Sequence, residues 1–592
     1  MTTSTPDVDV RSHRGRGRRR LTAVAYVATL VVVAGAVVGL VMNSRATQRC
    51  TGPQSSIRVA VSADESGALD RLARRWTADG PAVDGHCVGA TVIPKPPNDV
   101  AAALGGWDRA RDGEPPHVWI PDSSLWVSVA ASRPAGAAVL AERPTSIASS
   151  PVVLALRRPL AEALGWPQRS LDWLDVIGAF ARPDVWAKAG HPEWARLRVG
   201  VTDPSRSTAG LASVLSILDP MATGIVRDEQ LVGGLGFAQV LGALAPDTAA
   251  FFAAQNPKAP PGPNSIVAAF PALERDVAAY DADGPAMPLV PVYGTQLPVV
   301  ADYPYAVLSA DWVSETDRQA AEQFRQYLLT PVAQRALGTA GLRGPDRKAP
   351  EAAVAATMPG FQGAIAAPRA NPEPAALSRI ITEWANLQRQ VNLLALLDTS
   401  GSMRKPVPGT PLTRLALLQQ TASTGFGLLT NTTSIGLWEF SLRTTDPSEY
   451  RELAPFGPLP GNIGSVPRRA ALAQAVRRMR ADGATPLYNT VYAAFHHMQQ
   501  RWQPNSTNAV LLITDGKNEL EGGLTLATLV GNLAREQRRD RPVQIVTIAV
   551  GPEADAEALR QISKATGGRT FVVRDPATAI QTLILAFTGR LQ

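Results

Sequence analysis

Residues 391–403 read VNLLALLDTSGSM, an uninterrupted apolar run that ends in an acid and two serines. A run of this kind is typical of a strand that is buried on both faces of a parallel sheet. In open α/β sheets, ligands bind beyond the carboxyl ends of the strands, which is where Asp398, Ser400 and Ser402 follow this run. Glycine adopts tight turns at little steric cost, so a turn at Gly401 would let the three side chains direct their oxygen atoms at one point. The stretch therefore predicts an α/β fold with a polar site at one edge of its sheet.

Two further segments are expected to reach the same edge. Residues 509–514 read AVLLIT and are followed directly by Asp515, so a second buried strand ends in a carboxylate. Between the two strands, the segment 482–495 (DGATPLYNTVYAAF) places Thr485 on a loop before a helix. Further strands, with amphipathic helices between them, are expected at residues 434–441, 543–551 and 569–573. The region 376–592 is therefore predicted to form a doubly wound, Rossmann-like sheet.

The segments DTSGSM, GATPLYNT and LLITDGKN together resemble the von Willebrand factor A (VWA) family. The resemblance implies a metal-ion-dependent adhesion site (MIDAS) that Ser400, Ser402 and Thr485 ligate directly and Asp398 and Asp515 mainly through water. Oxygen ligands with few carboxylates suit Mg²⁺, or Ca²⁺ with looser geometry, and Mn²⁺ as a substitute. Two carboxylates roughly balance one divalent cation, so the metal stays attractive to an Asp or Glu carboxylate of a protein partner. We therefore expect an adhesive, metal-dependent binding function.

The region 50–344 alternates short β-branched runs with helical patterns, which also predicts an α/β fold. Strands are expected at residues 57–62, 87–93, 117–120, 151–156, 197–202 and 289–293. Four segments resemble the type II periplasmic solute-binding fold of molybdate- and sulfate-type binding proteins: IRVAVSADESGALDRLARRW, PHVWIPDSS, SSPVVLALRR and LRVGVTDPSRSTAGL. In that fold two lobes close on a ligand, so the region is expected to form a two-lobed solute-binding domain.

The resemblance implies that a small molecule or an oxyanion binds at the turns between strands and helices. Five hydroxyl residues occupy such turns, namely Ser62, Ser123, Ser124, Ser207 and Thr208. The alternative is that these side chains cap helices, which serine and threonine do routinely.

The N-terminal end predicts a membrane anchor. Residues 1–20 form a basic tail, and residues 21–42 contain no charge over a length close to the roughly 20 residues that a helix needs to cross a bilayer. Positive charge before the span places the N-terminus in the cytoplasm and the bulk of the chain outside the cell. The alternative is a cleaved signal peptide, whose apolar core would be shorter than this run.

Cys50 and Cys87 are the only cysteines, and both follow the predicted span on its oxidising side. We therefore expect them to form a disulfide, with two unpaired buried thiols as the alternative. Residues 345–375 are rich in proline and alanine and are expected to form a linker between the two folded regions.

The charge distribution and the absence of common catalytic motifs argue against nucleic-acid binding and against an enzyme. The net charge of +7 includes +4 from residues 1–20, where six arginines face two aspartates, so the folded part carries little of the positive charge that nucleic-acid binding requires. The chain contains no H-E-x-x-H, G-x-S-x-G or G-x-x-x-x-G-K-[ST] motif, which favours a binding protein over an enzyme. Two alternatives to adhesion are a solute-sensing receptor that acts through residues 50–344, and a chelatase-like partner of AAA-type motors.

Overall fold

The structure is a computed structural model, and it describes residue 50 and the bulk of the chain up to residue 573. The described ranges are 50, 52–140, 144–182, 184–256, 258, 263–294, 298–349, 359–408, 410–443, 445–551 and 554–573. The predicted basic tail (1–20) and membrane span (21–42) lie outside these ranges. Among the described helices, none combines the length and the apolar character that crossing a bilayer requires.

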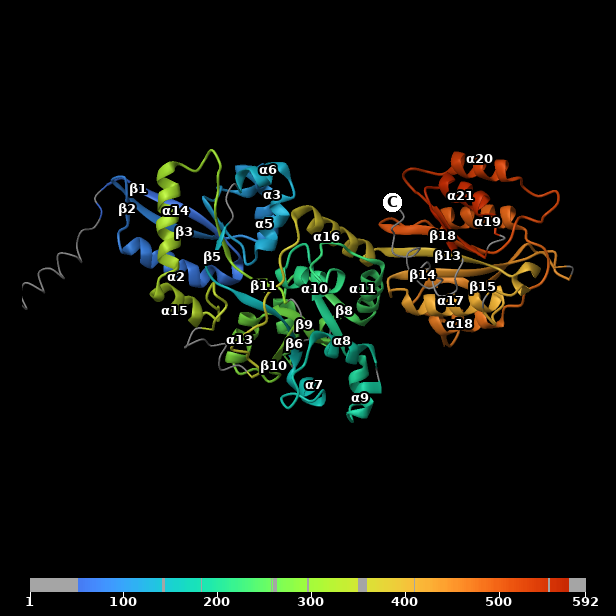
Figure 1. Cartoon of the computed structure of the whole chain (residues 1–592), viewed down its shortest axis with the longest axis horizontal. Coiled ribbons are helices and arrows are strands. Elements are labelled where there is room, and N and C mark those ends of the chain that lie inside the picture. Colours follow the sequence, from blue (N-terminus) through green and yellow to red (C-terminus); the bar gives the residue numbers. More distant parts are fainter. Residues whose placement is uncertain are drawn as a thin grey trace, which may run out of the picture.

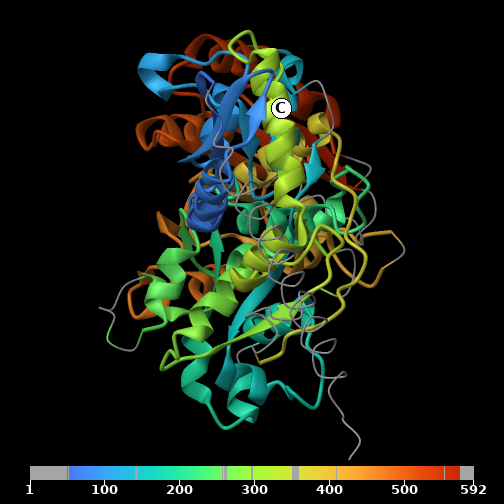
Figure 2. The same ribbon diagram turned by 90° about the vertical axis from the view of Figure 1, so that its left-hand side faces the viewer.

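The first region forms two lobes, each built on its own sheet. The sheet of the first lobe has the strand order β2-β3-β1-β4-β12-β5. Its strands are β1 (Gln54–Val61), β2 (Ala82–Val83), β3 (His86–Pro94), β4 (Val118–Ile120), β5 (Thr145–Ser146) and β12 (Pro304–Val307). Helices α2 (Ser66–Ala78) and α14 (Glu315–Leu328) contact this sheet, and α14 crosses in front of its blue strands in Figure 2.

The sheet of the second lobe has the order β10-β6-β9-β7-β8, with β11 paired to β6. Its strands are β6 (Ser150–Arg157), β7 (Arg198–Thr202), β8 (Leu241–Ala245), β9 (Val267–Leu273), β10 (Leu289–Tyr293) and β11 (Val300–Ala301). Helices of this lobe include α8 (Trp173–Ala181), α10 (Thr208–Leu218), α11 (Asp228–Val240) and α13 (Glu274–Ala282). The chain passes between the lobes twice, before β6 and after β11, which matches the predicted two-lobed α/β fold.

The start of the described chain is tied to the first lobe. Cys50 and Cys87, the latter in β3, are joined by a disulfide. The bond closes a loop that contains β1 and α2, because the two cysteines are 37 residues apart in sequence. A disulfide suits a domain on the extracytoplasmic side of a membrane.

The second region contains one six-stranded sheet in the order β15-β14-β13-β18-β19-β20, parallel except for the edge strand β15. Its strands are β13 (Gln390–Asp398), β14 (Thr433–Phe440), β15 (Tyr450–Pro458), β18 (Ser506–Thr514), β19 (Gln544–Val550) and β20 (Thr570–Val573). Helices α17 (Arg414–Leu428) and α18 (Arg468–Arg478) lie on one side of the sheet in Figure 1. Helices α19 (Leu487–Gln500), α20 (Leu526–Glu536) and α21 (Ala556–Ala565) lie on the other.

The alternation of side chains along β13 explains why helices cover both faces of this sheet. Leu393 and Leu397 pack in the core beneath α17 and α18, whereas Leu394 and Leu396 pack in the core beneath α19, α20 and α21. Because successive side chains of a strand point to opposite faces, an apolar run of this length fills two cores at once. Asp398 is the last residue of β13, beyond the leucines that pack in the two cores.

Helix α16 (Pro374–Gln388) precedes β13 and was expected to belong to the second region. Its buried side chains Leu377, Ile380, Trp384 and Leu387 pack in the core of the first region instead. A single residue, Arg389, separates this helix from β13. Figure 1 shows α16 beside α10 and α11, at the junction with the second region.

Candidate metal centre

The five residues predicted to form the metal site all lie at one edge of the sheet of the second region, where its parallel strands end. Asp398 is the last residue of β13, and Asp515 follows Thr514, the last residue of the neighbouring parallel strand β18. Thr485 arrives on the loop before α19, and that loop is fixed by a 2.8 Å hydrogen bond from the Gly401 N–H to the Gly483 carbonyl.

Hydrogen bonds join four of these residues in a chain. The backbone N–H of Ser400 donates to Asp398 Oδ1 at 2.8 Å. The hydroxyls of Ser400 and Ser402 lie 2.9 Å apart, and Ser402 Oγ donates to Asp515 Oδ1 at 2.7 Å. The Thr514 hydroxyl donates to the other oxygen of Asp398. Asp398, Ser400, Ser402 and Asp515 therefore lie together in one hydrogen-bonded cluster.

Thr485 lies close to the same cluster. Its hydroxyl and its backbone N–H both donate to Glu519 Oε2, each at 3.2 Å. A Cβ built on Gly516 would lie 3.3 Å from Thr485 Oγ1 and 3.6 Å from Ser402 Oγ, so both hydroxyls lie close to Gly516. Glu519 is a third carboxylate at this edge, and sequence reasoning missed it.

A second residue that sequence reasoning missed is Arg414, the first residue of α17. Its Nη1 atom donates to Asp515 Oδ2 at 2.6 Å, and the side chains of both residues are buried. The guanidinium lies against Gly551, where a Cβ would be 3.6 Å from Arg414 Cζ. Asp515 therefore uses one oxygen to accept from Ser402 and the other to pair with a positive charge.

Burial controls the ionisation of Asp398. Loss of solvent raises the pKa of this carboxyl to about 6, and the negative charge of Asp515 adds to the rise. Hydrogen bonds from Thr514 and Ser400 act in the opposite direction and lower the pKa. A buried carboxylate of this kind is stabilised by any cation that comes close to it.

The site opens into a groove of about 680 Å³. Its lining includes Ser402, Arg414, Asp515 and Glu519 from the cluster described above. The remaining lining residues are Lys405, Gly516, Lys517, Ala554, Asp555, Ala556 and Glu557. The groove gives a partner molecule access to the oxygen cluster.

The donor set fits a hard divalent cation. Within the residues that the structure describes, no group of three or more His, Cys, Asp and Glu side chains is placed to hold a metal ion. The predicted set differs from such groups, because three of its five members are hydroxyls and all of its donors are oxygen atoms. Ser400, Ser402 and Thr485, with Asp398 and Asp515, are the residues that would hold the ion.

The five hydroxyl residues predicted to bind a solute are all engaged within the protein. Ser123 and Ser207 accept hydrogen bonds from backbone N–H groups of the helices that they cap, α5 (Ser124–Ala131) and α10. Ser62 accepts from the Asp122 N–H at 3.2 Å, and Thr208 accepts from Trp126 Nε1 at 2.7 Å. Ser124 Oγ accepts from Asn371 Nδ2, in the segment before α16. Capping, the alternative, accounts for two of the five.

Comparison with family models agrees with this two-part architecture. Residues 57–343 match the model of bacterial extracellular solute-binding proteins, and residues 392–585 match that of the von Willebrand factor type A domain. The chain joins an extracellular solute-binding domain to a VWA domain. Both resemblances predicted from the sequence are thereby confirmed.

Relatives that match most of the chain exist in Mycobacterium tuberculosis. Two uncharacterized proteins, from strains CDC 1551 and H37Rv, are 25% identical to this chain over 581 residues, which cover 95% of this chain and 82% of each relative. Among solved structures, a periplasmic thiamin binding protein is 13% identical, with 56% of this chain and 96% of that chain covered and a TM-score of 0.38. A von Willebrand factor type A protein from Catenulispora acidiphila is 21% identical, with 34% and 42% covered and a TM-score of 0.27.

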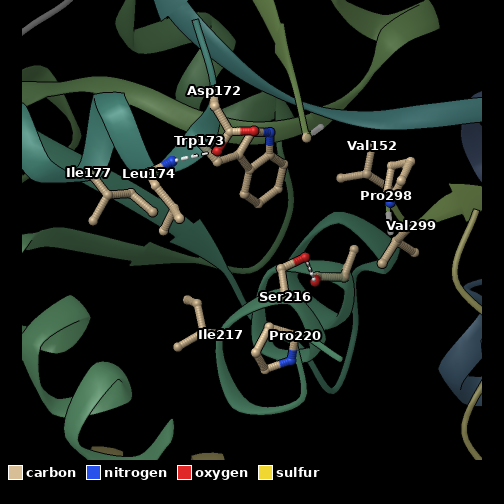
Figure 3. Close-up of a pocket in the computed structure, with 12 residues that line it drawn as sticks. Val152, Asp172, Trp173, Leu174, Ile177, Ser216, Ile217, Pro220, Pro298 and Val299 are labelled. Carbon is tan, nitrogen blue, oxygen red and sulfur yellow. Dashed lines mark hydrogen bonds between the residues drawn. The ribbon is translucent and has the colours of Figure 1, made fainter. Parts of the chain in front are cut away.

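The solute-binding domain also contains an apolar cavity of about 160 Å³ in its second lobe. Figure 3 shows Trp173 and Ile177 of α8 facing Ile217 and Pro220 at the end of α10 across this space. The Trp173 indole N–H donates to the Val292 carbonyl, so its polar atom is already satisfied. None of the five predicted solute ligands lines this cavity.

Proposed function

We propose that this chain is a single-pass membrane protein whose VWA domain holds a divalent cation and binds a carboxylate of a protein partner. The observation that supports it is the convergence of the Asp398, Ser400, Ser402, Thr485 and Asp515 side chains at one sheet edge, beside an open groove. The ion is Mg²⁺, or Ca²⁺ or Mn²⁺ in its place, because every donor is a hard oxygen.

The chemistry follows from charge. A bound cation offers an exchangeable position to an Asp or Glu side chain of the partner. Neutral hydroxyls supply ligands without adding negative charge, and Arg414 offsets the charge of Asp515. Without the cation, the three carboxylates at the edge would repel an acidic partner, so binding is expected to depend on metal.

The placement at the cell surface rests on the first half of the chain. The match to extracellular solute-binding proteins and the Cys50–Cys87 disulfide both favour an extracytoplasmic position. The uncharged segment 21–42 and the arginines before it would anchor the chain with its N-terminus in the cytoplasm. Shaving intact cells with protease should remove the VWA domain.

Calorimetric titration of Mg²⁺, Ca²⁺ and Mn²⁺ into the full-length chain tests the metal site. Wild type should bind one ion, and Asp398→Ala should lose that binding because the mutation removes a central carboxylate. Glu557→Ala is the matched control, since Glu557 lines the same groove and is exposed. Equal metal binding by wild type and Asp398→Ala would refute the proposed site.

A further inference from the structure

The segment 359–373, here called the strap, connects the solute-binding domain to α16. It begins along the second lobe, where buried Arg343 donates to the carbonyls of Gln362 and Gly363. Arg343 is itself paired with buried Glu274 of α13, so the start of the strap is held by a fixed ion pair. The strap was predicted to be a linker, yet it makes specific contacts along its length.

Arg369 of the strap occupies a built site at the end of α10. Its Nη2 atom pairs with Asp219 Oδ2 at 2.6 Å, and its Nη1 atom donates to the carbonyls of Leu215 and Asp219 at 3.1 and 2.7 Å. Both side chains are almost fully buried, at 2% and 1% exposure. The carbonyls at the end of a helix carry partial negative charge and favour a cation, so the second lobe presents a guanidinium site that the strap fills.

Two residues further on, the strap reaches the first lobe. Asn371 Nδ2 donates to Ser124 Oγ at 2.5 Å, and Ser124 is the first residue of α5. This hydroxyl is one of the positions predicted to bind a solute. The backbone N–H of Ser124 donates to Asp302 at the crossover between the lobes. The strap therefore places its own amide at a turn where the family resemblance implied a ligand.

Helix α16 continues the bridge, since it contacts α5 of the first lobe and both α10 and α11 of the second. Leu387 packs so closely on α11 that a Cβ on Gly234 would lie 2.8 Å from its Cδ1 atom. Trp384 stacks at an angle on Phe237 with ring centroids 6.2 Å apart. An opening motion of the two lobes would have to detach this apolar face from one of them.

The lobes also touch each other directly behind the strap. Trp126 of α5 donates to Thr208 of α10, and Arg275 of the second lobe pairs with Glu65 of the first at 2.7 Å. The domain thus has the contacts of a closed state, and the strap and α16 lie across both halves. Figure 1 shows α16 spanning from the side of α5 to the side of α11.

We propose that the carboxyl end of α10 and the start of α5 together form a peptide site, which residues 369–371 fill in cis. The guanidinium of Arg369 and the amide of Asn371 take the place of a solute in holding the lobes together. The solute-binding fold then serves as a closed arm that carries the VWA domain, and the ligand class of the site on α10 and α5 is an Arg-x-Asn peptide. This inference is independent of whether the VWA domain binds metal.

The test compares the full-length chain with the double variant Arg369→Ala/Asn371→Ala. A fluorescent peptide of residues 366–374 (AAPRANPEP) is titrated into each. We expect the double variant to bind the peptide at least tenfold more tightly than wild type, in which the strap already occupies the site. A peptide with alanine at both key positions should bind neither chain.

Hydrogen exchange supplies a second readout. Exchange should speed up at least tenfold in the first turn of α5 and the last turn of α10 in the double variant, and stay unchanged in the control Arg335→Ala/Asn532→Ala. If the double variant does not fold, Asn371→Ala removes only the amide that donates to Ser124 and should speed exchange at α5 alone. A folded variant with wild-type exchange and no peptide binding, or a wild type that binds the peptide equally well, would overturn the proposal.

Discussion

Arg414 places a positive charge beside one of the two carboxylates that are proposed to hold the metal. Two charges a few ångströms apart interact by several kcal/mol even at an effective dielectric constant of about 20. Arg414 therefore lowers the affinity of the site for a cation, while it keeps Asp515 in place. Because Ser402 still holds the other oxygen of Asp515 at 2.7 Å, removal of the arginine should change the charge more than the geometry.

We therefore expect Arg414→Gln to bind Mg²⁺ about tenfold or more tightly than wild type, equivalent to about 1.4 kcal/mol. Lys517→Gln, an exposed residue of the same groove, should change the affinity little. Weaker metal binding by Arg414→Gln would show that the main effect of the arginine is to hold Asp515 in place, and that its positive charge matters less. Metal binding by this variant alone would mean that Arg414 stands in for the cation in wild type.

His117 is buried in the first lobe and is expected to make this lobe sensitive to acid. Its Nδ1 atom accepts the Arg58 backbone N–H at 2.8 Å, and its Nε2 atom lies 3.0 Å from Arg58 Nη2. Burial and the charge of Arg58 lower the pKa of His117, against the opposing effect of Asp317 at 4.0 Å. The unfolded chain therefore binds a proton more readily than the folded one as the pH falls below about 6.5.

Stability of the solute-binding domain should consequently decrease as the pH falls from 7.5 through 6.5 to 5.5, in the window below the ordinary histidine pKa. Urea unfolding at these pH values measures the effect. His117→Asn should show a shallower pH dependence than wild type, because all other titrating groups are common to both chains. An identical slope in the two chains would assign the acid sensitivity elsewhere.

The sequence could predict that the five proposed ligands lie close together, because each one follows or precedes a recognisable strand or helix end. It could not predict Glu519 or Arg414, since each reaches the site through tertiary contacts. Glu519 is placed by a backbone bond from its N–H to the Thr485 carbonyl at 2.9 Å. Arg414 is placed by the start of α17, and its N–H donates to the Lys405 carbonyl at 3.0 Å. Neither contact leaves a spacing signal in the chain.

Among the elements, the loop that carries Thr485 depends on one glycine. Gly483 has φ +82°, and a Cβ there would lie 2.2 Å from the Leu442 carbonyl oxygen. Its own carbonyl accepts the Gly401 N–H and so fixes the loop that bears Ser400 and Ser402. Both the backbone conformation and the close approach therefore exclude a side chain at this position.

We expect Gly483→Ala to destabilise the VWA domain by about 2–3 kcal/mol and to weaken metal binding, because Thr485 must shift with the loop. Chemical unfolding and metal titration measure the two effects. Gly464→Ala is the control, since Gly464 has φ +59° with no atom within 4 Å of its Cβ position. The control should show only the smaller conformational cost, and equal losses in both variants would rule out the clash as the cause.

Strands were easier to predict than the partners of helices. The apolar runs at 57–62, 151–156 and 509–514 match β1, β6 and β18 within a few residues, because burial on both faces leaves a plain signal. Most of helix α16 falls in the region 376–592 that was predicted to form the VWA domain, but its apolar face packs on α10 and α11. The pattern of a helix predicts that one face is buried and cannot say against which element.

At the scale of the whole molecule, the two domains have separate cores. The buried apolar clusters of the two lobes and α16 contain residues up to 387. The buried apolar clusters of the VWA domain contain residues from 393 to 573. No buried apolar cluster among the described residues contains members of both sets. We therefore expect two unfolding transitions in calorimetry of the full-length chain.

Metal should shift only one of these transitions. A ligand at 100 times its Kd stabilises the folded state that binds it by about 2.7 kcal/mol, which raises the midpoint of a domain of this size by about 5–10 °C. Mg²⁺ should therefore raise the VWA transition, and a chelator or Asp398→Ala should abolish the rise. The transition of the solute-binding domain should stay in place, since the proposed ligands all follow α16 in the chain. A rise of both transitions together would instead mean that α16, one residue from β13, transmits the stability of the metal site into the closed arm.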